Sequence, residues 1–154
     1  MLKRAAYLFL LCILSCTAFG DELVSGLMES WKSYEAKVAE GAGLDERISV
    51  LSSILDAYKD SGIDLSTVED ERDLLDSWRF YKQQAAEGAG IEQRINILDR
   101  ILGKYSGKNI DLKEVKNELE FTIFEFEDSV SYVEERSDSN ICDIILKVER
   151  KYLN

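Results

Sequence analysis

Carboxylates are the most abundant side chains in this sequence that could perform acid–base chemistry. The 154-residue chain has 30 Asp and Glu residues against 19 Lys and Arg, and it contains no histidine. Catalytic triads that use histidine and metal sites with histidine ligands are therefore excluded. General acid–base work would have to fall to carboxylates, Lys, Tyr or Cys.

The acidic clusters at Glu69-Asp70-Glu71 and Glu134-Glu135 have the residue types of paired acids or cation ligands, but not the required spacing. They do not match an EF-hand loop, and the solvated faces of long helices explain them without chemistry. The glycine turns at 41–43 and 88–90 lack the strand and the Lys-Ser/Thr that phosphate cradles need. An envelope hydrolase would need two acids facing each other across a cleft, which a thin stack of repeats offers poorly. The sequence predicts no enzyme, no metal site and no cofactor.

The first 20 residues have the layout of a secretory signal, with Lys3 and Arg4 followed by an apolar run over 5–14. This run is too short for a membrane span. Ile13-Leu14-Ser15-Cys16 resembles the relaxed lipoprotein boxes of spirochaetes, and that resemblance implies a lipid on Cys16. The alternative is cleavage after Ala18-Phe19-Gly20, which would release a soluble protein. Both alternatives predict export to the bacterial envelope, as a membrane-anchored lipoprotein or a periplasmic protein.

Net charge limits the class of partner, and the repeat position of Cys142 indicates its role. The net charge of −11 becomes −13 when Lys3 and Arg4 leave with the signal, so nucleic acid and anionic lipid are disfavoured. A protein partner with a basic segment would be favoured, and its binding would depend on salt. Cys142 occupies the repeat position of Ile48 and Ile95, which predicts a small buried hydrophobe rather than a nucleophile.

An internal repeat organises the chain. The segment from Trp31 to Glu71 returns from Trp78 to Glu118 at a constant offset of 47 residues. Such a period is typical of stacked supersecondary units. Each copy predicts two helices, because apolar residues recur at steps of three and four. In the second helix these residues are Leu44, Ile48, Leu51, Ile54, Leu55 and Tyr58, repeated as Ile91, Ile95, Leu98, Ile101, Leu102 and Tyr105.

A third, degenerate copy completes the array. Tyr152 continues the series of Tyr58 and Tyr105, but Glu125 stands where the other copies have tryptophan. We predict a single all-α domain over 21–154, built from three antiparallel hairpins over about 21–62, 63–109 and 110–154. The six helices are predicted at about 21–40, 45–60, 65–87, 91–105, 111–136 and 140–153. Glycines 41, 43, 88 and 90 are expected as left-handed caps, and Ser66 and Asp111 as helix starts.

The paired helices, with Trp and Tyr on the first and the pattern R-I-x-x-L-x-x-I-L-x-x-Y on the second, resemble tetratricopeptide-type (TPR-like) helical repeats. The resemblance covers nearly the whole chain after the signal. It implies a solenoid of stacked hairpins, and it implies binding of a protein or peptide partner.

Aromatic residues are the candidate partner contacts. Trp31 and Tyr34, repeated as Trp78 and Tyr81, would suit an interface, and the alternative is that they pack between hairpins. On the first helix of the third copy, one stripe of apolar residues predicts a core face. Three aromatic residues project on the opposite side of this helix. Those three are Phe121, Phe124 and Tyr132. They would form a docking or dimer surface if exposed, and the alternative is burial between layers.

The sequence thus predicts a non-catalytic protein–protein interaction or scaffolding module of the cell envelope. The alternative is a small-ligand carrier that works with a transporter, which would need an aromatic-lined cavity between the hairpins. The pairs Glu40–Arg47 and Glu87–Arg94 recur around the glycine turn and are predicted to be salt bridges.

Overall fold

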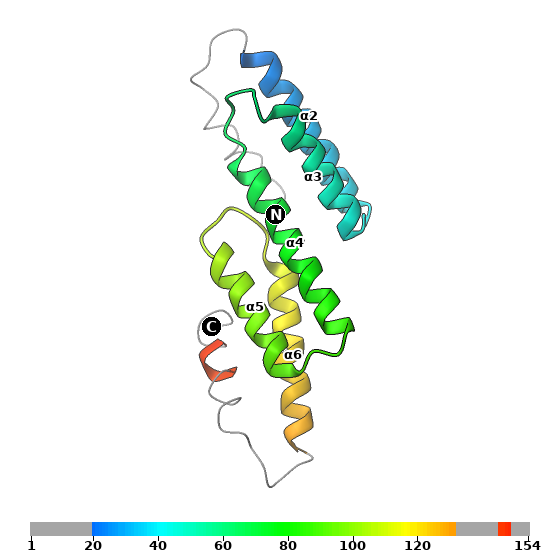
Figure 1. Ribbon diagram of the computed structural model, residues 1–154, viewed down its shortest axis with the longest axis vertical. Coiled ribbons are helices and arrows are strands. Elements are labelled where there is room, and N and C mark those ends of the chain that lie inside the picture. The colour runs from blue at the N-terminus through cyan, green and yellow to red at the C-terminus, as the bar shows by residue number, and fades with distance from the viewer. Residues whose placement is uncertain (1–19, 132–144, 149–154) are drawn as a thin grey trace. The chain divides into compact units, whose positions relative to one another are not determined.

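The computed structural model describes residues 20–131 and 145–148, and all of its regular structure in these ranges is helical (Figure 1). The helices are α2 (Gly20–Ala39), α3 (Leu44–Tyr58), α4 (Ser66–Ala86), α5 (Ile91–Tyr105) and α6 (Lys113–Ser131). A helical turn follows at 145–148. The all-α prediction is confirmed, and the first five predicted helices are found. The signal with Cys16, the residue Tyr132 and Cys142 lie outside the described residues.

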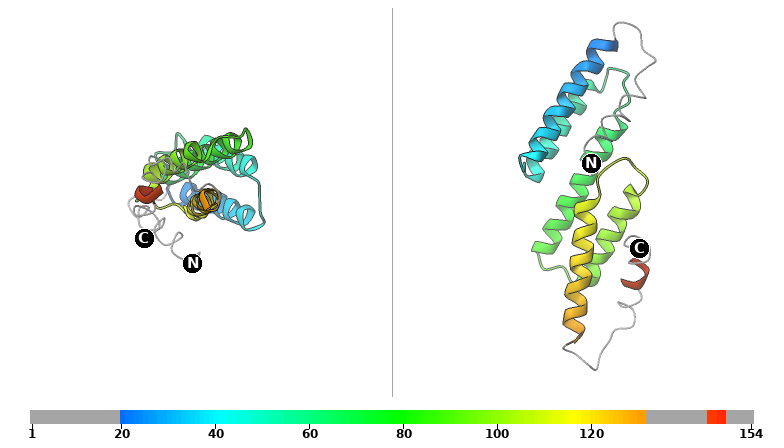
Figure 2. Two further views of the ribbon diagram at one scale, coloured as in Figure 1. Left: turned by 90° about the horizontal axis from the view of Figure 1, so that it is seen from below. Right: turned by 180° about the vertical axis from the view of Figure 1, so that it is seen from behind.

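Two compact units divide the chain at residues 75 and 76, within α4. In the first unit α2 packs against α3, and in the second α5 packs against α6 (Figure 2). The division does not follow the sequence repeat, because Leu65, just before α4, and Val68 and Leu75 in its first half belong to the core of the first unit. None of the described helices is long and apolar enough to cross a membrane.

Glycine turns end the first helix of the first two hairpins, and only one glycine of each turn is left-handed. Gly41 and Gly88 have φ values of 85° and 89°. In the first turn the amide of Ala42 donates to the carbonyl of Lys37, and the amide of Gly41 donates to that of Val38. This is the Schellman pattern, and the second turn repeats it. The prediction for the other glycines was wrong: Gly43 and Gly90 have φ of −68° and −63° and precede the next helix as extended N-caps.

Aspartates begin the first helices of the second and third copies. The Asp64 carboxylate accepts a hydrogen bond from the Ser66 amide at 2.9 Å, and Asp111 accepts one from the Lys113 amide at 2.8 Å. These bonds satisfy amides that a helix start leaves without an intrahelical partner. Asp111 is confirmed as a helix start. Ser66 is confirmed as well, because α4 begins there, although the side chain that accepts the amide hydrogen bond belongs to Asp64.

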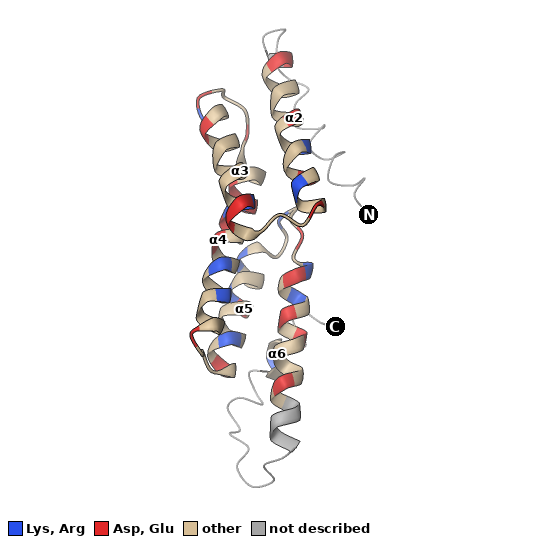
Figure 3. Cartoon of the chain, turned by 90° about the vertical axis from the view of Figure 1, so that its right-hand side faces the viewer, with Lys and Arg blue, Asp and Glu red and all other residues tan. Residues whose placement is uncertain are grey.

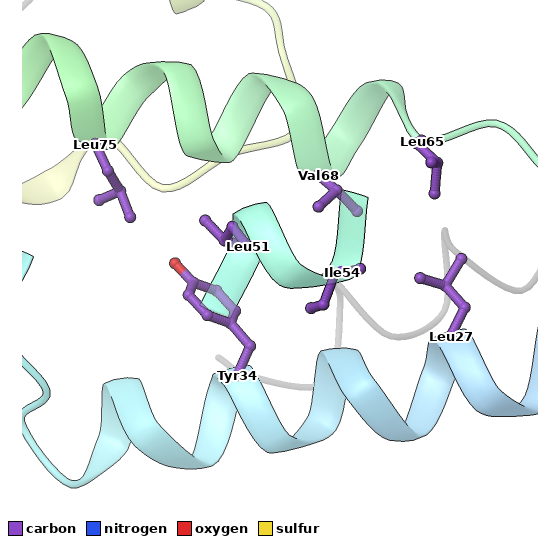
Figure 4. Close-up of a cluster of buried hydrophobic side chains, with 7 residues drawn as sticks. All are labelled: Leu27, Tyr34, Leu51, Ile54, Leu65, Val68 and Leu75. Carbon is purple, nitrogen blue, oxygen red and sulfur yellow. The ribbon is translucent and has the colours of Figure 1, made fainter. Parts of the chain in front are cut away.

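The core of the first unit is a cluster of apolar side chains between α2, α3 and the start of α4 (Figure 4). Its buried members are Leu27, Tyr34, Leu51, Ile54, Leu65, Val68 and Leu75. The equivalents of Leu51 and Ile54 in the second copy, Leu98 and Ile101, are also buried. In the third copy the same positions are Ile145 and Val148, and both are buried. These two positions of the predicted core stripe are therefore buried in all three copies, at about 1.5–3 kcal/mol for each fully buried side chain.

Candidate functional site

A polar group made by one tyrosine, one glutamate and one arginine lies inside the first unit. The Tyr34 hydroxyl on α2 donates to the Glu71 carboxylate on α4 at 2.7 Å. The Arg47 guanidinium on α3 lies 3.7 Å from the same carboxylate oxygen. The group therefore joins three helices. Only 13% of the Arg47 side chain and 14% of the Glu71 side chain are exposed, so these charges are screened weakly by solvent.

The second unit repeats this group 47 residues later. Tyr81 donates to Glu118 at 2.8 Å, and Arg94 lies 3.8 Å from the same oxygen. Arg94 also donates to Glu125 at 2.8 Å. Glu125 stands where the other copies carry tryptophan, so the third copy uses that position to bind the arginine of the second. Lys82 donates to the second oxygen of Glu118 at 2.8 Å.

These contacts correct the predicted salt bridges. Arg47 pairs with Glu71, and Arg94 with Glu118 and Glu125; neither pairs with the glutamate across its glycine turn among the described residues. Across the first turn Lys37 pairs with Glu46. The arginines instead reach the next helix, because there they meet a carboxylate that a tyrosine also binds.

The protonation of these groups follows from burial and hydrogen bonding. Burial, together with the negative charge of Glu71, raises the pKa of Tyr34. Burial also raises the pKa of Tyr81. Burial by itself would raise the pKa of Glu118, but the hydrogen bonds from Lys82 and Tyr81 outweigh it and lower that pKa. The tyrosines therefore stay neutral donors and Glu118 stays an ionised acceptor near pH 7. This arrangement ties three helices together in each unit.

The tryptophans flank the two tyrosines. Trp78 stacks on Tyr81 with ring centroids 5.1 Å apart, and Trp31 lies 5.2 Å from Tyr34 at an interplanar angle of 44°. Trp31 donates to Glu35 at 3.1 Å, whereas Lys82, at the equivalent position in the second copy, lies 4.7 Å from the Trp78 ring. Among the four aromatic residues singled out from the sequence, Tyr34, Trp78 and Tyr81 are buried and Trp31 is half-buried. This placement agrees with the packing alternative and leaves little of their surface for a partner.

The aromatic pair on α6 is exposed. Phe121 is 55% exposed and Phe124 is 63% exposed. They are three residues apart, so they lie on the same side of the helix. The predicted core stripe on the same helix is buried at Leu119 and Ile123. We call Phe121 and Phe124 the α6 aromatic pair.

A groove lies on the surface of the second unit between α4 and α5. Its volume is about 390 Å³, and its lining residues are Asp76, Ser77, Phe80, Ile97, Arg100 and Ile101. Phe80 is 54% exposed. Sequence reasoning missed this groove. A signal was present in the repeat, because the first copy has Ser33 and Ser53 at the positions of Phe80 and Arg100.

Sequence reasoning also missed Glu71 and Glu118, although both end the repeated segment. Within the described part of the chain, no group of three or more Cys, Asp or Glu side chains is placed to hold a metal ion.

Comparison with known proteins found no matching family model, no matching curated protein and no matching solved structure.

Proposed function

We propose that this chain is a non-catalytic protein-binding module of the bacterial envelope, and that the α6 aromatic pair is its principal contact surface. The observation that carries the proposal is the exposure of two phenylalanines next to each other on a helix whose opposite side is already buried. Exposed apolar patches of this kind mark interaction sites, and aromatic residues dominate the energetics of protein interfaces.

Charge supports a cationic partner. Glu114 and Glu120 on α6 are exposed, and the whole chain carries a net charge of −11. Complementary charge speeds association and disfavours partners of the same sign. The partner class is therefore a protein surface that combines apolar contact with positive charge. The stacked hairpins, which resemble TPR-like repeats, supply a rigid support for such a surface.

Tagged full-length protein, cross-linked and captured from its native envelope, tests this function. The variant Phe121→Ser/Phe124→Ser is expected to lose the captured partner while its circular dichroism stays unchanged. The matched control is Leu23→Ser/Val38→Ser, which removes two exposed apolar side chains from α2. The proposal fails if the α6 variant captures the same proteins as wild type, or if only the α2 control loses them.

The membrane anchor is the second part of the proposal. Cys16, at the end of the apolar run, would carry the lipid that holds the module at a membrane. Metabolic labelling with a radioactive fatty acid is expected to mark the wild-type chain and to spare Cys16→Ser. Equal labelling of Cys16→Ser and wild type would overturn the anchor, and labelling of neither would favour cleavage after Gly20.

A further inference from the structure

We propose that the cationic, apolar partner of the α6 aromatic pair is the α4–α5 groove of a second copy of this chain. The inference rests on the proposed function and names the partner of that same surface. Both surfaces lie in the second unit. The α6 aromatic pair supplies two exposed rings beside the negative charge of Glu120, and the groove supplies an apolar recess beside the positive charge of Arg100.

The groove is not needed to fold its hairpin. The first copy builds the same hairpin with Ser33 and Ser53, both exposed, where the second copy has Phe80 and Arg100. Phe80 is exposed beside Ile97 and Ile101, so it belongs to an apolar groove, and such patches mark binding sites. Phe80 and Arg100 therefore need an explanation other than packing, and a binding partner supplies one.

Size fits two aromatic rings. A cavity of about 150 Å³ lined by apolar side chains holds one benzene ring. The groove, at about 390 Å³, has room for the rings of Phe121 and Phe124, with Ile97 and Ile101 contributing apolar walls.

Charge fits as well. Asp76 forms an ion pair with Arg79 at 2.7 Å, which leaves Arg100 as the uncompensated charge of the groove. Arg100 is exposed and has no ion-pair partner among the described residues; the same holds for Glu120, the neighbour of Phe121. In Figure 3, where the cartoon is coloured by residue type, basic positions occur on α5 and on the later part of α4, and α6 carries basic positions near its start and acidic positions along its length. Docking would bring Glu120 to Arg100 as the aromatic rings enter the groove.

The contact must join two molecules. On α4, Tyr81 and Lys82 face α6 through Glu118, whereas Phe80 lines the groove, and no groove-lining residue comes from α6. A chain therefore cannot place its own α6 aromatic pair in its own groove. Because the two surfaces differ, the contact is head-to-tail and can continue from copy to copy.

Sedimentation velocity of the full-length chain in a density-matched mild detergent tests the proposal. We expect the wild type to associate as concentration rises at low salt, and to dissociate at high salt. Arg100→Glu and Glu120→Arg are each expected to weaken association at least about tenfold, as losses of close interfacial charge pairs do. A mixture of the two variants should regain association, because each groove then meets an α6 surface of opposite charge on the other variant.

The variant Phe80→Ser/Arg100→Ser is expected to fold, since it has serine at the two positions where the first copy also has serine. It should be monomeric. A wild type that stays monomeric at all concentrations overturns the proposal, as does association that both charge reversals leave unchanged. If the wild type is monomeric but capture from the envelope still depends on Phe121 and Phe124, self-association fails and the binding function stands. If capture is also independent of them, both fail.

Discussion

The Tyr34 hydroxyl donates a 2.7 Å hydrogen bond to the Glu71 carboxylate, 37 residues away on the next repeat. Tyr81 and Glu118 form the same bond over the same separation. The bond connects the first helix of one copy to the first helix of the next, so it links successive copies of the repeat. Because its acceptor is an ionised and largely buried carboxylate, it is stronger than a bond between neutral groups.

Tyr34→Phe is expected to lower the free energy of unfolding by about 1.5–3 kcal/mol, the range for hydrogen bonds to charged groups. The matched control is Tyr105→Phe, which removes a buried hydroxyl whose neighbour, the Ser77 hydroxyl, is neutral and lies 3.4 Å away. Its loss should be about 0.5–1.5 kcal/mol. Urea denaturation followed by circular dichroism measures both. Equal losses would mean that the charge of Glu71 adds nothing.

Alkaline conditions should weaken the wild type through the same tyrosine. The folded-state pKa of Tyr34 is raised by burial and by Glu71, whereas the unfolded chain ionises near pH 10. The stabilisation is therefore complete below about pH 10 and is lost as pH rises above it. Unfolding midpoints measured from pH 8 to 11 should fall less steeply in Tyr34→Phe than in wild type. Parallel curves would contradict this assignment.

Acid should act through Glu118. Its folded-state pKa is lowered because the hydrogen bonds from Lys82 and Tyr81 outweigh burial. A lowered pKa gives stability that is present above the unfolded value, about 4.3, and that is lost as pH falls below it. Glu118→Gln should be less stable than wild type at pH 7, and the difference should shrink towards pH 3. Thermal melts across this range provide the measurement, and a constant difference would rule the mechanism out.

The glycine turns offer a matched pair of substitutions. Gly88→Ala should cost about 1 kcal/mol or more, because φ is 89° and alanine is strained there. Gly90→Ala, two residues away with φ of −63°, should cost less, because no left-handed backbone is strained there and only the N-cap preference of glycine over alanine is lost. A methyl group added at either position would meet no atom within 4 Å apart from its chain neighbours. A steric clash therefore does not contribute to the difference between the two variants. Similar effects at both positions would show that the left-handed turn is not what the glycine provides.

Local signals predicted the helices well. The Gly-Ala-Gly turns and the three-and-four spacing placed α3 and α5 close to their observed bounds, because both signals act within a few residues. The partners of Arg47 and Arg94 were misassigned because a nearby glutamate was chosen over Glu71 and Glu118, which come from another repeat. Only the offset of 47 could have pointed to them. The spacing of α6 does not decide whether Phe121 is exposed, since that depends on what packs beside the helix.

The tryptophans also give the chain two optical probes. Trp31 belongs to the first compact unit and Trp78 to the second, and the sequence has no others. Their surroundings differ, since Trp31 donates to a carboxylate and Trp78 lies beneath an ammonium group. Replacing either one by phenylalanine leaves a single emitter, so the fluorescence of each variant follows one half of the molecule. Thermal unfolding followed by the single tryptophan of each variant would reveal whether the two units unfold together or one before the other.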